Sequence, residues 1–164
     1  MGDTMTKQSQ STNKIDILTL LREEKTIEIP LQGDSMYPFL RPLKDHVILS
    51  PIGNRQLKVN DVCLYRRNDG VLICHRICEI NKNGIYTVGD HQDVIDGPFK
   101  SDVFYGIMTG YLRNGKKHSC QEWHYRVLSS IWLLLLGKRL FLLRNRSRVL
   151  AFFATIQNHA KIKK

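Results

Sequence analysis

Two side chains in this 164-residue sequence have the chemistry needed to cleave a peptide bond. Ser35 lies in residues 33–38, where a glycine and a proline favour a turn that holds a hydroxyl clear of the backbone. A serine hydroxyl is a weak nucleophile until a base takes its proton. His75 suits that role because an imidazole has a pKa of about 6.5. We therefore interpret Ser35 as a candidate nucleophile and His75 as its candidate general base.

Acidic residues that could orient His75 cluster further along the chain. Asp90, Asp93 and Asp96 fall within residues 89–98, and a carboxylate behind an imidazole holds the ring in the orientation that a base requires. Backbone N–H groups around Ser35 could bind the oxyanion formed during acyl transfer. The spacing alone leaves a simpler interpretation open, in which Ser35 and Asp90 are turn residues and His75 is a half-buried strand residue.

Short strands must position these side chains. Alternating or apolar runs occur at 26–29, 46–49, 62–65, 71–77, 85–88 and 103–108. The Asn-, Asp- and Gly-containing residues 67–70 and 81–84 between them predict hairpin turns. Closely spaced strands without intervening helices predict a mainly β fold, antiparallel and partly closed. Residues 14–25 predict a short amphipathic helix with Ile17, Leu20 and Leu21 on one face, and the polar residues 1–13 predict a disordered tail.

Four segments of the β region resemble signal peptidase I, and they occur in the order that this family has. The family's serine box has the core Ser-Met-x-Pro, and a Gly-Asp-Val strand, a His-Arg-Ile box and a Gly-Asp-Asn-Asn box follow it. The matching segments here are Ser35-Met36-Tyr37-Pro38, Asn60-Asp61-Val62, His75-Arg76-Ile77 and Gly89-Asp90-His91-Gln92. A histidine in the third box resembles the archaeal, endoplasmic-reticulum and sporulation enzymes, whereas most bacterial members have lysine there.

This resemblance implies a signal-peptidase-like serine endopeptidase that cuts signal or leader peptides after small residues. In the histidine subtype the important acid lies six residues after the aspartate of the fourth box, which is Asp96 here, and Asp90 is the second candidate. Residues 14–112 would form the peptidase-like β domain, and no cofactor is expected. The positions implied for oxyanion binding and substrate contact are Gly33, Met36 and Pro38.

The charge of the chain is concentrated in residues 113–164, which carry twelve Lys or Arg and one acid of a total net charge of +10. Residues 113–120 predict a basic linker, and the following Leu-rich and Trp-containing sequence predicts one or two helices. No apolar run reaches 18 residues, so a membrane span is not expected. Residues 123–148 instead predict peripheral contact with a membrane, in an otherwise cytoplasmic protein, or packing on the β domain.

Other functions fit the sequence less well. Cys74, His75 and Cys78 lack the CxxC spacing of a zinc site, so no metal is predicted. The basic segment could bind nucleic acid, but it lacks the interleaved aromatic residues of a single-strand platform. The alternative to an enzyme is a catalytically inactive module that keeps a peptide-binding groove of the same fold.

Overall fold

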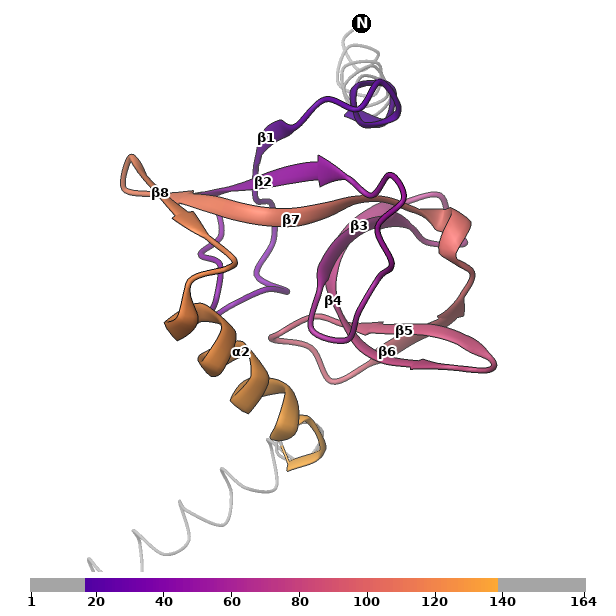
Figure 1. The fold of residues 1–164 in the computed structure, drawn as a ribbon. Helices are drawn as coiled ribbons and strands as arrows, with labels where there is room; N and C mark the ends of the chain where they lie inside the picture. Colours follow the sequence, from indigo (N-terminus) through magenta and orange to yellow (C-terminus); the bar gives the residue numbers. More distant parts are fainter. Residues whose placement is uncertain (1–16, 139–164) are drawn as a thin grey trace, which may run out of the picture.

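The computed structural model describes residues 17–138, and most of them form one antiparallel sheet of eight strands (Figure 1). Two of the connections between strands fall at residues 67–70 and 81–84, where hairpin turns were predicted. They are β1 (Ile27–Pro30), β2 (Asp45–Pro51), β3 (Val62–Arg66), β4 (Leu72–Asn81), β5 (Gly84–Val88), β6 (Ile95–Phe99), β7 (Phe104–Arg113) and β8 (Lys116–Ser119).

The strand order is β1-β2-β7-β3-β4-β5-β6, with β8 pairing with β7 beyond this path. The prediction of a mainly β, antiparallel fold is confirmed. The sheet curls strongly through β3, β4 and β5 but stays open, because β1 and β6 form its two ends and do not pair with each other in the described chain (Figure 1). Its central strand β7 brings the end of the β region back beside β2 and β3.

Two hydrophobic cores lie on opposite faces of β3, because side chains alternate along a strand. The first core takes Val62 and Leu64 from β3 and packs them with Met36, Leu40 and Tyr111, among others. The second core takes Cys63 and Tyr65, and packs them with residues that include Ile77, Phe99 and Phe104. His75 opposes Cys63 in the β3–β4 register, so its side chain belongs to the face of the second core.

The leading helix is present, and residues 17–22 are helical in the described chain. Its buried side chains are Leu18 and Leu21, with Ile17 packed against the first core. Leu20, predicted on the same face, is only partly buried.

The boundary predicted after residue 112 does not coincide with a structural boundary. Residues 116–119, expected in a linker, form β8, which pairs with β7 through the register Gly110 to Ser119. The helix α2 (Trp123–Leu134) then packs against the sheet, and its Tyr125 lies in the first core. Part of the basic segment therefore belongs to the β domain, because β8 pairs with β7 and Tyr125 packs in the first core.

Some sequence predictions fall beyond the structure. The tail at 1–13 and the basic segment after residue 138, which includes residues 139–148 of the predicted membrane contact, lie outside the described residues. Among the helices described in residues 17–138, none has both the length and the apolar character needed to cross a membrane.

Candidate active site

Ser35 lies in a tight turn between β1 and β2. The backbone N–H of Tyr37 donates to the carbonyl of Asp34 at 2.9 Å, and the N–H of Leu40 donates to the carbonyl of Met36 at 2.9 Å. Met36 and Leu40 are completely buried in the first core, whereas Ser35 is half-buried. The two apolar anchors thus hold the turn against the sheet, and the serine just before them stays near the surface.

The residues implied for substrate contact occupy three different environments. Gly33 is exposed and has φ of +79°, a conformation that glycine adopts without steric cost. Pro38 is exposed and follows a cis peptide bond. Met36 is buried with an exposed fraction of 0%, so its side chain anchors the turn and does not line a substrate surface.

The Ser35 turn rests on the turn that follows β5. The backbone N–H of His91 donates to the Ser35 carbonyl at 2.8 Å, and the rings of Tyr37 and His91 meet edge to face at 5.9 Å. A Cβ added to Gly89 would lie only 2.8 Å from the Ser35 carbonyl oxygen. Gly89 is therefore needed for close approach of the two backbones, which explains why a glycine stands there.

Strand register relates Ser35 to His75. Val88 opposes Arg76 in the β4–β5 pair, so extending that register by one residue sets Gly89 opposite His75. Residues opposite each other point their Cβ positions to the same side of a sheet, about 5 Å apart. The Ser35 carbonyl lies against the Cβ position of Gly89, so the Ser35 turn contacts the residue that follows β5, the strand that pairs with the His75 strand β4.

His75 and Asp96 are brought together, with a tyrosine beside them. His75 Nδ1 lies 3.7 Å from Asp96 Oδ2, which is beyond a hydrogen bond, and 3.3 Å from the Tyr65 hydroxyl. The Tyr65 hydroxyl donates to Asp96 Oδ2 at 3.2 Å and accepts from Thr87 Oγ1 at 2.9 Å. Tyr65 therefore connects the imidazole to the carboxylate that was predicted to orient it.

These contacts fix the tautomer of His75. The single Tyr65 hydroxyl proton goes to Asp96, so the oxygen of Tyr65 can only accept from Thr87 and from His75. Nδ1 of His75 must then carry the proton, and Nε2 keeps its lone pair. An imidazole held in this form has the nitrogen that a general base needs.

Burial sets the charge of the same groups. Desolvation lowers the pKa of His75 to about 4, although the negative charge of Asp96 raises it in part. Burial also raises the pKa of Tyr65, so its hydroxyl stays protonated and keeps donating to Asp96. At neutral pH the cluster is therefore a neutral imidazole and a neutral phenol beside a carboxyl group that is partly exposed.

Asp90, the second candidate for orienting His75, faces another partner. Its carboxylate accepts from Arg76 Nε at 2.9 Å and from Arg76 Nη2 at 2.8 Å, and both side chains are fully buried. Arg76 Nη1 also donates to Asn60 Oδ1 at 3.0 Å, and its guanidinium lies 5.0 Å from the centre of the Phe39 ring. Asp90 therefore ties the turn after β5 to β4 and to the loop before β3.

In the described chain the Ser35 hydroxyl forms no hydrogen bond with His75, whose side-chain bond there is to Tyr65. The structure thus brings His75, Tyr65 and Asp96 into one cluster, and it connects the Ser35 turn to the turn after β5 through Gly89 and His91. It also separates Asp90 from that cluster through the Arg76 pair. The role of each residue in a reaction stays a prediction.

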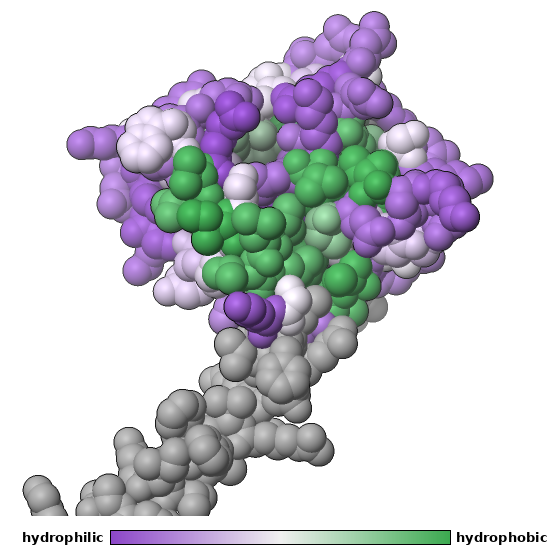
Figure 2. All heavy atoms as spheres, turned by 60° about the horizontal axis from the view of Figure 1, so that its bottom comes forward, coloured by the Kyte–Doolittle hydropathy of each residue, from purple (hydrophilic) through white to green (hydrophobic). Residues whose placement is uncertain are grey.

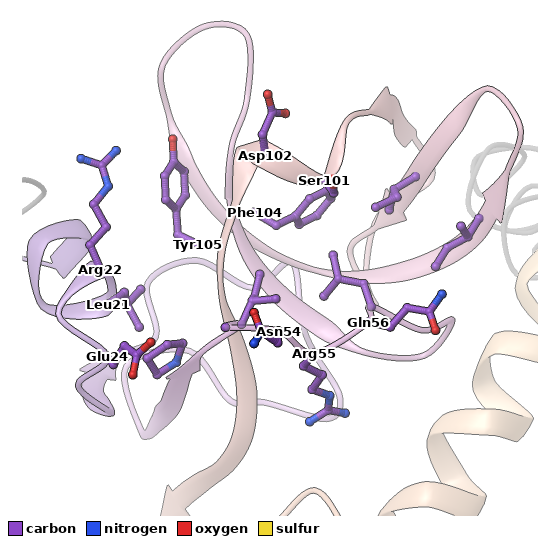
Figure 3. Close-up of a pocket in the computed structure, with 16 residues that line it drawn as sticks. Leu21, Arg22, Glu24, Asn54, Arg55, Gln56, Ser101, Asp102, Phe104 and Tyr105 are labelled. Carbon is purple, nitrogen blue, oxygen red and sulfur yellow. The ribbon is translucent and has the colours of Figure 1, made fainter.

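A hollow in the described chain lies away from this site (Figure 3). It has a volume of about 650 Å³ and lies between the leading helix, the loop after β2 and the start of β7. Arg22 and Tyr105 lie side by side on its wall, 5.8 Å from guanidinium carbon to ring centre (Figure 3). Its lining contains no histidine, and neither Ser35 nor His75 belongs to it. A smaller hollow of about 340 Å³ is lined in part by Asp96.

Tyr65 and Thr87 are the members of this cluster that sequence reasoning missed. The usable signal was the predicted turn at 67–70, because counting back from a hairpin turn pairs β3 with β4 and sets Cys63 opposite His75. Tyr65 then follows two residues along on the same face. A scan against protein-family models and a search of curated proteins found no match to this chain.

Proposed function

We propose that this protein is a serine endopeptidase of the signal-peptidase type, which cleaves signal or leader peptides with Ser35 as nucleophile and His75 as general base. The observation that carries the proposal is the His75 cluster. A buried, neutral imidazole with its proton on Nδ1 lies on β4, and the Ser35 turn contacts Gly89 at the end of the neighbouring strand β5. The four family-like segments, which include both turns and β4, add support from the sequence.

The proposed reaction begins when Ser35 Oγ attacks the carbonyl carbon of the scissile peptide and its proton passes to His75 Nε2. The imidazolium is stabilised through Tyr65 by the Asp96 carboxylate. His75 then gives that proton to the leaving amine, and an ester on Ser35 remains. Water, deprotonated by the same imidazole, hydrolyses the ester and releases the acid product. Backbone N–H groups around residues 33–35 would bind the oxyanion, an interaction worth about 10²–10³ in rate per donor.

The reaction requires a contact that the free protein lacks, because the Ser35 hydroxyl must come within reach of His75 Nε2. Ser35 is half-buried and its turn is exposed at Gly33, Asp34 and Tyr37, so a bound peptide could shift it. This observation also favours the second candidate, a peptide-binding module without catalysis. The two candidates share the Ser35 turn and the His75 cluster, and they differ in whether Ser35 and His75 meet.

Substitution of Ser35 by alanine tests the proposal. We expect Ser35→Ala to lower kcat/KM by about 10³-fold or more on peptides with small residues before the cleaved bond, because the nucleophile is removed. Cleavage is followed by mass spectrometry of the products. Ser101→Ala, an exposed serine outside the site, is the matched control and keeps the wild-type rate. Equal cleavage by Ser35→Ala and wild type would overturn the mechanism, and tight binding without cleavage by the wild type would favour the binding module.

A further inference from the structure

The helix α2 is fixed to the β domain by one face. Tyr125 and Ser129 are its buried residues, and Ser129 Oγ accepts from Asn60 Nδ2 at 3.0 Å. Trp132 Nε1 donates to the carbonyl of Asp90 at 3.3 Å. The sheet therefore decides which face of α2 points outward, and it orients that face next to the turn after β5.

The outward face of α2 is mainly apolar, with His124 as the exposed polar residue among its apolar side chains. Six of its side chains have exposed fractions between 43% and 85%, a large amount of apolar surface for twelve helical residues and the one that follows. At about 100° per residue they fall within an arc of about 140°, opposite the arc that contains Tyr125, Ser129 and Trp132. They are Trp123, Val127, Leu128, Ile131, Leu134 and Leu135, and together we call them the apolar face of α2.

Two further exposed apolar side chains follow, within a few residues, the turn that α2 contacts. Val94 and Ile95 are exposed at 57% and 41%, and they follow Asp90, whose carbonyl α2 contacts through Trp132. Figure 2 shows hydrophobic side chains gathered over the face of the molecule that carries α2. Large contiguous apolar patches are uncommon on soluble monomers and mark surfaces that bind something.

The charge of the surrounding sequence indicates which class of partner the apolar face of α2 binds. Residues 123–164 contain nine Lys or Arg and no Asp or Glu, and Arg126 and Lys138 among them are exposed in the described chain. A second copy of this chain would bring two such clusters of cations together, and their repulsion opposes pairing through this face. An anionic lipid surface satisfies both features, since headgroups neutralise the cations and acyl chains take up the apolar side chains.

We propose that the apolar face of α2, with Val94 and Ile95, binds the surface of an anionic bilayer with the helix lying in the plane of the membrane. α2 has twelve residues, about 18 Å at 1.5 Å per residue, against about 30 Å of hydrocarbon. Trp123 at its start is 77% exposed and suits the level of the headgroups. This inference does not depend on the peptidase proposal.

Vesicle flotation tests it with the full chain. We expect co-flotation with phosphatidylglycerol–phosphatidylcholine vesicles, and at least about fivefold weaker partition to pure phosphatidylcholine or at high salt. The double variant Val127→Glu/Ile131→Glu should partition about tenfold less or lower to the anionic vesicles, because it removes two apolar contacts and adds two negative charges. Circular dichroism shows whether the variant keeps its fold.

The matched control is Val71→Glu/Ile80→Glu, which makes comparable changes at two other exposed apolar side chains. Val71 lies just before β4 and Ile80 lies in β4, and their exposed fractions are 40% and 41%. This control should bind vesicles nearly as wild type does. Equal loss in both double variants, or undiminished binding by the α2 variant, would overturn the assignment of this face. A dimer in light scattering that the α2 variant abolishes, without vesicle binding, would assign the face to a second copy instead.

Discussion

At the scale of single residues, the single hydroxyl proton of Tyr65 determines the hydrogen bonds within the site. Tyr65 has one proton and gives it to Asp96, which forces His75 to donate from Nδ1. Desolvation keeps the imidazole neutral, and the same burial makes each hydrogen bond costly to lose. The tyrosine therefore acts as a positioning residue between a base and an acid that are 3.7 Å apart.

Replacing Tyr65 by phenylalanine should release the His75 tautomer. Without the phenolic oxygen, Nδ1–H has lost its acceptor, so we expect a mixture of tautomers in nitrogen NMR spectra of histidine-labelled protein. The free energy of unfolding should fall by about 1–3 kcal/mol, since buried polar groups lose partners. Thr87→Val is the control, because it leaves the His75–Tyr65 bond intact. A single unchanged tautomer in Tyr65→Phe would refute the role given to Tyr65.

At the scale of elements, three segments distant in sequence depend on one another. The Ser35 turn lies on Gly89, the turn after Gly89 is tied to β4 by the Asp90–Arg76 pair, and α2 contacts the carbonyl of Asp90. Removing one partner of a buried ion pair leaves a charge without compensation, which typically costs 3–5 kcal/mol. The glycine and the ion pair thus hold the serine turn against the sheet more firmly than the turn's own two backbone bonds could.

Alanine at position 89 should displace the serine turn. Its Cβ would lie 2.8 Å from the Ser35 carbonyl and 2.9 Å from Gln92 Oε1, and the backbone carbonyl cannot move aside as a side chain can. We expect about 1–3 kcal/mol lower free energy of unfolding in urea and at least about tenfold lower peptidase activity.

Gly137→Ala is the matched control, because nothing lies within 4 Å of its Cβ position and the residue is helical. It should be neutral or slightly stabilising. Wild-type stability and activity in Gly89→Ala would show that the serine turn does not depend on contact with Gly89.

At the scale of the whole molecule, two buried ionisable sites make stability depend on pH in separate windows. His75 has a pKa of about 4 in the folded chain against about 6.5 when unfolded, so between these values only the unfolded chain takes up the proton. Burial would raise the pKa of Asp45, but hydrogen bonds from Arg113 and Arg41 outweigh it and lower the pKa from 3.8 to about 2. The stability that Asp45 contributes is therefore lost only below about pH 4.

The free energy of unfolding should therefore decrease as the pH is lowered from about 6.5 to about 4. The difference in His75 pKa corresponds to about 3 kcal/mol at 1.36 kcal/mol per unit. Urea unfolding at half-unit intervals of pH measures it. The variant His75→Gln should lose this part of the pH dependence and keep the part below pH 4 that Asp45 controls. Identical pH profiles for the variant and the wild type would contradict the low pKa of His75.

The sequence by itself determined the strand-rich antiparallel class, the hairpin turns and the cationic segment, because turn residues and alternation act over a few neighbouring positions. It could not tell whether Asp90 or Asp96 faces His75, since these aspartates lie in one short stretch and only strand register separates their sides. Tyr65 between His75 and Asp96, and β8 and α2 joining the β domain, were likewise decided by tertiary structure. Each of these arrangements depends on pairing and burial between segments far apart in the chain, and the pattern of neighbouring residues does not predict such contacts.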